Sequence, residues 1–187
     1  MKQITIQSFL LILLITMSSF QNKTSPTITI ENFSKSSDLK NWRVVNDDVM
    51  GGVSKSKFII NKEGNGSFYG TVSTANYGGF ASIRCSMSPI EINNSKYVKL
   101  RIKGDGKKYQ FRMKHRSSDY HSYIQTFTTN GEWQTIEIDL SNLYPSFRGR
   151  KLNMSNFKES TVEEISILIG NKLNESFILE IDKITLE

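Results

Sequence analysis

Acidic residues and glycines gather in one short segment, NDDVMGGVS (residues 46–54). Adjacent Asp47 and Asp48 could serve a glycosidase, which needs two carboxyl groups about 5–10 Å apart at one bond. Neighbouring residues of an extended chain point to opposite faces, so this pair does not converge easily. The pattern favours a specific turn, in which one aspartate accepts backbone N–H groups and Gly51 and Gly52 supply unusual backbone angles. Calcium binding through loop carboxylates is a second interpretation.

The two histidines of the chain, His115 and His121, flank Asp119 in HRSSDYH. Three such donors could bind zinc or iron, but a hairpin loop at this spacing fixes no tetrahedral geometry. Histidines exposed to solvent in a polar turn explain the segment equally well. A hydrolase that used Asp48 with His121 would need both side chains in one pocket. No nucleophile motif and no phosphate loop accompanies them, so we predict no catalytic residue, metal or cofactor.

A loop of aromatic and basic residues, NLYPSFRGRKL, includes Tyr144, Phe147 and Arg148. Arginine beside aromatic rings suits contacts with carboxylates, phosphates or peptides, so the loop could be a recognition surface. The alternative is a loop that covers a sheet edge. In that case Phe147 would pack inward and Arg148 would bridge to an acid such as Asp47 or Asp48.

The elements that must position these residues are strands, because apolar and polar side chains alternate in five segments. The side chains expected to be buried are Val98, Leu100 and Ile102; Tyr109, Phe111 and Met113; Ile136, Ile138 and Leu140; Ile165, Ile167 and Ile169; and Phe177, Leu179 and Ile181. Glycine- and asparagine-rich turns separate them, as in about ten antiparallel strands. The best helical candidate is a turn or two around residues 153–158. The fold class predicted is all-β, an antiparallel two-sheet sandwich or jelly roll.

Composition indicates one globular domain: the chain has 187 residues, 37% of them hydrophobic. Its formal charge is +6, with bases interleaved among acids, which favours an ordinary soluble surface over nucleic acid binding. Cys85 is the single cysteine, so no intramolecular disulfide can form. We expect it to be a buried structural thiol.

The N-terminus predicts export. Lys2 precedes the apolar run FLLILLI, which is followed by small residues, as in a secretory signal peptide. We assign residues 1–20 to the signal peptide, 21–26 to a linker and 27–187 to a single β-sandwich domain. The protein would then be periplasmic or secreted. An uncleaved membrane anchor is the alternative, because the cleavage site lacks an A-x-A pattern.

Five segments in order resemble the complex I intermediate-associated protein 30 family: WRVVNDDVMGGVSKSKF, GTVSTANYGGFASIR, RIKGDGKKYQFRMK, YPSFRGRKL and ILIGNKLNESFILEIDKI. The resemblance implies a galactose-binding-like jelly roll. It also implies the family role of a chaperone-like assembly factor for NADH:ubiquinone oxidoreductase, without an established catalytic site. The family-motif positions, whose function is unassigned, are Asp47, Asp48, Met50, Gly51, Gly52, Arg148, Gly149 and Arg150. The leader lacks the arginine-rich character of a mitochondrial transit peptide, which indicates an exported bacterial relative.

Two functions therefore compete. In the first, the domain is a non-catalytic module that holds a protein client, such as an assembly intermediate of a membrane complex. In the second, it is a secreted carbohydrate-binding module, in which Trp133, Tyr77 or Tyr144 offers a stacking face to a sugar.

Overall fold

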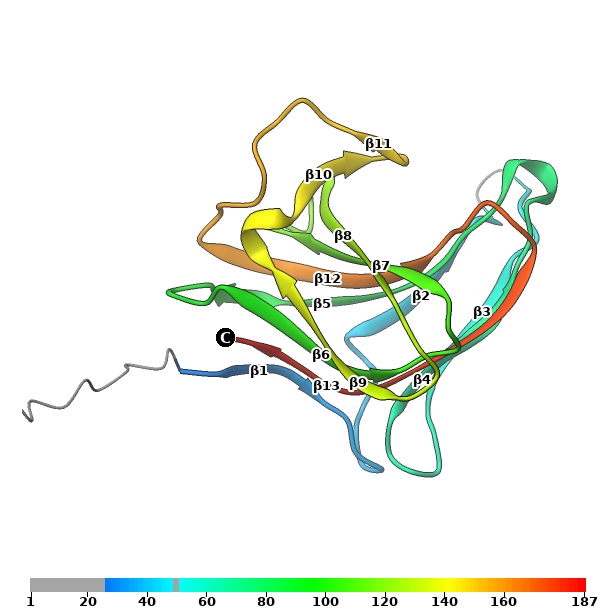
Figure 1. Cartoon of the computed structure of the whole chain (residues 1–187), viewed down its shortest axis with the longest axis horizontal. Coiled ribbons are helices and arrows are strands. Elements are labelled where there is room, and N and C mark those ends of the chain that lie inside the picture. The colour runs from blue at the N-terminus through cyan, green and yellow to red at the C-terminus, as the bar shows by residue number, and fades with distance from the viewer. Residues whose placement is uncertain (1–25, 49–50) are drawn as a thin grey trace, which may run out of the picture.

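The computed structural model describes residues 26–48 and 51–187, which form two stacked antiparallel sheets (Figure 1). The six-stranded sheet has the order β3 (Lys55–Ile60), β4 (Gly66–Val72), β13 (Glu175–Leu186), β6 (Tyr97–Lys103) and β9 (Trp133–Asp139), and β1 (Ile28–Asn32) also pairs with β13. The seven-stranded sheet has the order β11 (Arg150–Lys151), β10 (Tyr144–Phe147), β8 (Ser122–Thr128), β7 (Lys108–Lys114), β12 (Thr161–Ile169), β5 (Ala81–Glu91) and β2 (Trp42–Asn46). The predicted all-β sandwich is confirmed.

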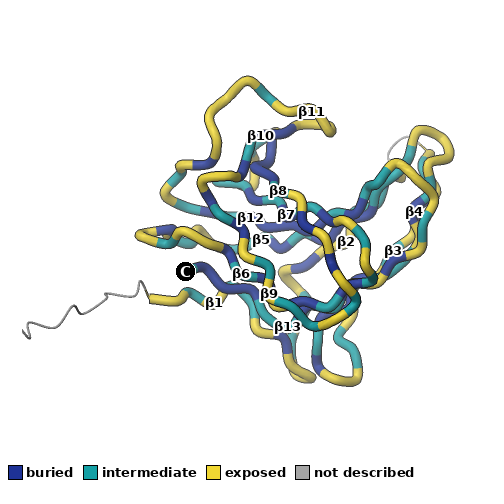
Figure 2. The backbone as a smooth tube through the Cα atoms, viewed as in Figure 1, coloured by how far each residue is buried: buried dark blue, intermediate teal, exposed yellow. Residues whose placement is uncertain are grey.

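The core lies between the sheets and consists of the inward-facing half of each alternating strand (Figure 2). Most of the predicted inward residues are fully buried; Ile136 is partly buried and packs against this core. On β13 the inward Leu179 and Ile181 have no exposed surface, whereas Ile178 between Phe177 and Leu179 is 48% exposed. A β-bulge between Ile181 and Lys183 then shifts the alternation by one residue. As a result, the last part of this long strand also buries apolar side chains.

Aromatic side chains close one end of the core. Phe33, Trp42 and Phe58 meet with ring centroids 5.1–5.8 Å apart, and the Trp42 indole N–H donates to Glu31. Cys85 is buried as expected on β5, where burial first, and then the charges of Glu31 and Glu164, raise the pKa of its thiol to about 12. The thiol is therefore protonated at neutral pH and acts as a small apolar group.

The helical turn expected around residues 153–158 is wrong. The backbone there is irregular, and the 3₁₀ turns that lie wholly within the described residues are η2 (Ala75–Tyr77) and η3 (Leu140–Asn142). Phe157 explains the difference, because it is buried against the Tyr123 ring and its N–H donates to the Leu143 carbonyl. Tertiary packing thus replaces the hydrogen bonds of a helical turn. Across the described part of the chain, no helix has the length and apolarity to span a bilayer.

Candidate binding surfaces

The loop that joins β2 to β3 connects the two sheets, and the carboxylate of Asp47 organises it. Asp47 accepts hydrogen bonds from the Ser54 hydroxyl (2.5 Å) and the Ser54 N–H (3.2 Å). It also accepts from the N–H groups of Gly79 (2.5 Å) and Phe80 (3.2 Å), in the loop before β5. The turn interpretation therefore holds for Asp47, although two of the donor groups belong to Ser54 and two to a distant loop, and none lies two residues further on.

The pKa of Asp47 reflects this cage of donors. Burial would raise the pKa, but the hydrogen bonds from Ser54, Gly79 and Phe80 outweigh burial and hold it below its ordinary value. Both carboxylate oxygens already accept hydrogen bonds, so Asp47 offers no free oxygen pair to a cation. A side chain at Gly52 would collide with Asp47, and one at Gly78 would lie 2.5 Å from its Oδ2 atom. Glycine at both positions lets the backbone approach the Asp47 carboxylate without a steric clash.

The other motif positions of this loop differ from Asp47. Asp48 is exposed, and its carbonyl accepts the N–H of Gly51, which has a φ of 83°. The carbonyl of Gly51 in turn accepts from the Asn76 side chain at 2.8 Å. Met50 lies outside the described residues. The loop is thus built around one buried aspartate, and a binding role for its other positions stays a prediction.

Asp48 and His121 do not share a pocket. Asp48 follows β2 and His121 precedes β8, and these strands are four apart in the seven-stranded sheet, or about 19 Å. The hydrolase hypothesis fails for this pair. His121 instead packs between Tyr120 and Tyr123, at ring distances of 5.0 and 5.1 Å.

The histidines and Asp119 also do not converge. His115 Nδ1 lies 2.9 Å from the Thr161 hydroxyl, and Asp119 accepts the N–H of Arg116. In the two described segments, 26–48 and 51–187, no three His, Cys, Asp or Glu side chains could hold a metal ion together.

The recognition loop lies at the opposite edge of the seven-stranded sheet from the Asp47 loop, across six strand spacings or about 29 Å. Here Tyr120, Phe147, Arg148 and Met154 form what we call the rim patch. The rings of Tyr120 and Phe147 are 5.3 Å apart, the Arg148 guanidinium lies 5.3 Å from the Phe147 ring, and the Tyr120 hydroxyl is 3.8 Å from the Met154 sulfur. The three apolar members are 61%, 37% and 44% exposed, for Tyr120, Phe147 and Met154.

Two features of the edge-covering alternative are wrong. Phe147 does not pack into the core, and Arg148 makes no bridge to Asp47 or Asp48, which lie at the other edge of the sheet. Arg148 (φ 48°) and Gly149 (φ 74°) instead form the tight turn between β10 and β11. Arg150 is exposed on β11.

A second surface covers the outside of the seven-stranded sheet. The strand registers place six residues side by side across it, in what we call the arginine row: Arg43, Arg84, Ser166, Arg112, Ile124 and Tyr144. The neighbouring row on one side consists of Val45, Ser82, Leu168, Gln110 and Thr126. Ser82 and Ser166 are only 1% and 5% exposed, so the floor of this face lies below its longer side chains.

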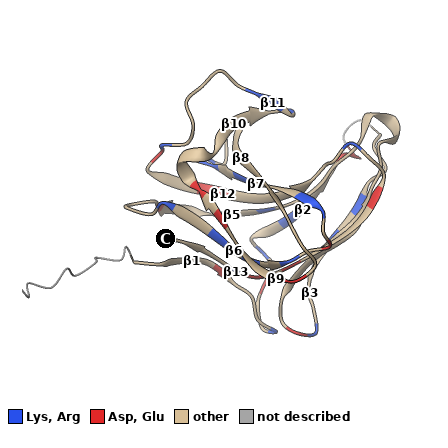
Figure 3. Ribbon diagram, in the orientation of Figure 1, with Lys and Arg blue, Asp and Glu red and all other residues tan. Residues whose placement is uncertain are grey.

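The carboxylate of Glu164, next to the arginine row, is already neutralised. It is 3% exposed and lies 2.6 Å from the Arg43 guanidinium and 3.9 Å from the Lys114 ammonium. Arg43 also donates to the Ser86 hydroxyl at 2.7 Å. Along the whole chain, acidic and basic residues interleave as predicted (Figure 3). Around Glu164 on this face, however, there are four basic side chains, those of Arg43, Arg84, Arg112 and Lys114.

Arg84 and Arg112 have no carboxylate of their own. Within the described segments, Arg112 donates to the side-chain oxygen of Gln110 at 3.3 Å, and no hydrogen bond or ion pair holds Arg84. Burial, followed by the like charge of Arg84, lowers the pKa of the Arg112 guanidinium despite the opposing charges of Glu164 and Tyr144. Neither arginine was predicted as a site residue from the sequence. The signal available was their outward position in the alternating strands SIRC and QFRMK.

The aromatic residues proposed for sugar stacking are scattered. Trp133 lies on β9 in the other sheet, with the Arg101 guanidinium 5.5 Å from its ring, and Tyr77 is fully exposed in η2. Only Tyr144 belongs to the arginine row, where the Lys151 ammonium lies 5.2 Å from its ring.

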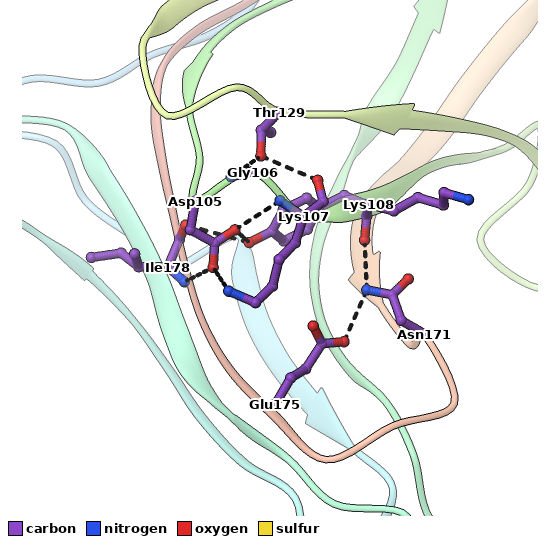
Figure 4. A network of polar contacts seen from close by, with 9 residues as sticks. Asp105, Gly106, Lys107, Lys108, Thr129, Asn171, Glu175 and Ile178 are labelled. Carbon is purple, nitrogen blue, oxygen red and sulfur yellow. Dashed lines mark hydrogen bonds and ion pairs between the residues drawn. The ribbon is translucent and has the colours of Figure 1, made fainter.

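The turn between β6 and β7 joins the two sheets, and a network of polar contacts around Asp105 holds it (Figure 4). Asp105 accepts hydrogen bonds from Lys107 (2.7 Å), the Tyr109 hydroxyl (2.9 Å) and the Ile178 N–H (3.1 Å). Burial opposes the charge, yet these donors hold the pKa of Asp105 below its ordinary value. Beside this turn, a pocket of about 220 Å³ is lined by Lys108, Tyr109, Gln110, Thr126, Gly170, Asn171 and Lys172.

The fold is similar to those of solved carbohydrate-binding modules. The family 11 module of a cellulosomal cellulase of Clostridium thermocellum has 18% identity and a TM-score of 0.65, covering 87% of this chain and 95% of that chain. A family 11 module of the same organism, in complex with a β-1,3-1,4-mixed-linked tetrasaccharide, has 18% identity and a TM-score of 0.64, covering 86% and 94%. An agarase has 11% identity and a TM-score of 0.57, covering 86% of this chain and 24% of that chain. At these identities the likeness establishes the jelly-roll sandwich and nothing more.

A sequence model described as Complex I intermediate-associated protein 30 matches residues 31–181. The match spans both the Asp47 loop and the β10–β11 turn, which contain the family-motif positions named from the sequence. Because it covers most of the chain, the protein belongs to the Complex I intermediate-associated protein 30 family.

Proposed function

We propose that the domain is a non-catalytic module that holds a protein client at the rim patch. The exposure of Tyr120, Phe147 and Met154 beside Arg148 is the observation that carries this proposal. Aromatic residues, methionine and arginine are enriched in protein interfaces and dominate their binding energy. Membership of the family supports the same conclusion. The client in this proposal is an assembly intermediate of a membrane complex, of the NADH:ubiquinone oxidoreductase type or another, reached by an exported protein.

Charge indicates what the client presents. Arg148, Arg150 and Lys151 follow one another around the β10–β11 turn, and within the described segments none of them forms an ion pair with a carboxylate. An apolar groove bordered by acidic side chains would complement both the rings and the cations.

Site-specific photo-crosslinking tests this proposal. A photoreactive residue at exposed Asn153, beside the rim patch, should capture one defined protein in native membranes, whereas the same residue at exposed Thr135 on the six-stranded sheet should not. The Phe147→Ser/Arg148→Ser variant should lose the adduct. Ile178→Ser, which removes an exposed apolar residue from the other sheet, should keep it. Equal adducts at both positions, or none at either, would contradict the proposal.

The second candidate function is carbohydrate binding on the arginine row. The observation that favours it is the joint presence, on one recessed sheet face, of hydroxyl groups, guanidinium groups and the half-buried Tyr144 ring. Hydroxyl and guanidinium groups hydrogen-bond sugars, and a tyrosine ring can cover an apolar sugar face. A glycan array with neutral and acidic sugars tests this function. Binding to none of the sugars on the array would exclude carbohydrate binding.

A further inference from the structure

Arg84 and Arg112 lie on either side of Ser166. Each of them pairs directly with Ser166 in the register of its strand, so all three side chains leave the sheet on the same face. Two strand spacings separate the Cα atoms of the arginines by about 10 Å. Long guanidinium side chains at this spacing can close from both sides on a group seated above the serine.

The two charges repel each other, and the charge of Glu164, which acts on Arg112 in the opposite sense, does not cancel the combined effect of burial and this repulsion. Glu164 is occupied by Arg43 and Lys114, and the nearest acceptor for Arg112 is the neutral Gln110. A buried or half-buried cation without a carboxylate costs free energy unless a ligand supplies the anion. The pair is therefore arranged as a receptor for negative charge.

We propose that Arg84, Ser166 and Arg112 bind an oxyanion carried by a negatively charged oligosaccharide, either a carboxylate or a sulfate ester. Each guanidinium presents a planar fork of N–H donors that matches such an oxyanion, and the Ser166 hydroxyl adds a donor from below. This inference deepens the second candidate function and does not depend on the rim patch.

The surroundings of the pair favour a sugar over an acidic peptide. The adjacent row presents Gln110 and Thr126, whose amide and hydroxyl groups suit a ligand that is polar along its whole length. Ser82 in the same row is 1% exposed and donates to the Val45 carbonyl. Cores of protein interfaces, by contrast, are apolar and poor in charge. The arginine row extends over five strand spacings, about 24 Å, which leaves room for several sugar units between Arg43 and Tyr144.

Calorimetric titration of the purified protein with matched oligosaccharides tests the inference. The probes are an oligogalacturonate and its neutral methyl ester, and a sulfated galactan oligomer and its desulfated counterpart. We expect at least one charged probe to bind, and its neutral counterpart to bind at least about tenfold more weakly. Arg84→Gln and Arg112→Gln should each weaken binding by about tenfold or more, since each removes one charge-assisted contact. Arg101→Gln, an arginine paired with Asp182 on the other sheet, should bind like the wild type.

Amide chemical shifts of the wild-type protein give a second readout that needs no variant. The charged probe should shift the signals of Ser166 and its neighbours on β5 and β7. Binding of neutral and charged probes with equal affinity would overturn the inference and leave carbohydrate binding standing. No binding of any probe, or arginine-dependent binding of a hexaglutamate peptide alone, would overturn it as well. None of these results bears on client capture at the rim patch.

Discussion

The outer faces of the two sheets use the same kinds of residue in different ways. On the six-stranded sheet, Lys99 lies 3.3 Å from Glu137 and 2.8 Å from Glu187, and Arg101 lies 2.9 Å from Asp182. On the seven-stranded sheet, by contrast, no hydrogen bond or ion pair within the described segments joins Arg84 or Arg112 to a carboxylate, and Glu164 acts on Arg112 only through its charge.

The pKa directions show the same contrast. Hydrogen bonds from the Lys99 ammonium to Glu187 and Glu137 raise the pKa of Lys99, whereas burial and the charge of Arg84 lower that of Arg112. Alternation decides which side chains face outward, but the cross-strand partner decides whether a charge is satisfied within the fold. Lys99 and Arg101 are thus satisfied within the fold, whereas Arg84 and Arg112 keep the charge that we propose binds a ligand.

The largest effect on stability should come from the loop between β2 and β3, which Asp47 organises. Asp47→Ala removes the acceptor shared by Ser54, Gly79 and Phe80, which leaves partly buried donors unsatisfied. We expect a loss of about 3 kcal/mol in the free energy of unfolding, measured with urea. Asp48→Ala, at the exposed neighbouring position, is the control and should change it by less than about 0.5 kcal/mol. Equal effects of the two substitutions would show that the loop is not organised by Asp47.

The carboxylates of Asp47 and Asp105 should make the stability of the protein depend on pH in the acidic range. The pKa values of Asp47 and Asp105 are lower in the folded state than the ordinary 3.8, so folding releases their protons more readily. Their contribution to stability is present above that value and is lost as the pH falls below it, through the folded-state pKa. Urea unfolding at pH 6 and pH 3 should show a smaller drop for Asp47→Asn than for the wild type. An unchanged drop would contradict the assigned hydrogen bonds.

The next prediction compares the loss of one carboxylate on each outer face. Glu164→Gln removes the carboxylate that neutralises Arg43 and Lys114 beside the arginine row, and should cost about 2 kcal/mol in the free energy of unfolding. Glu137→Gln breaks an exposed ion pair on the other face, and should cost less than about 0.5 kcal/mol. If Glu164→Gln were as mild as Glu137→Gln, the seven-stranded face would not be short of negative charge.

The rim patch should contribute least to stability. Phe147→Ser replaces an exposed ring, so the free energy of unfolding should change by less than about 0.5 kcal/mol. Phe157→Ala, which empties a buried site against Tyr123 beneath the same edge, should cost about 3 kcal/mol. A large loss in Phe147→Ser would mean that the patch serves the fold rather than a client.

Much of the fold could be predicted from the sequence, since period-two alternation is a local signal. Leu100 and Phe111 are buried as their strands required. The irregular path through Phe157 could not be predicted in this way, because its cause is a ring packed on Tyr123, far away in the sequence. The family resemblance, carried by the loop motifs, is confirmed over residues 31–181.

The candidate sites were harder to foresee. Asp47 and Arg148 belong to two family motifs and lie at opposite edges of one sheet. Their separation could not be predicted, because local sequence patterns do not determine the order of strands in a sheet. Arg84 and Arg112 were visible as outward residues. That no described carboxylate pairs with them depends on which strands flank β12, and only the assembled sheet determines that.

The central claim is that Arg84 and Arg112 of the seven-stranded face are free for a ligand, whereas Lys99 and Arg101 of the six-stranded face stabilise the fold. Its most direct test compares the urea midpoints, without ligand, of Arg84→Gln/Arg112→Gln and Lys99→Gln/Arg101→Gln, two variants with the same change in charge. We predict an equal or higher midpoint than the wild type for the first variant, because like charges no longer repel, and a lower midpoint for the second. A first variant that unfolds well before both the wild type and the second would contradict the claim.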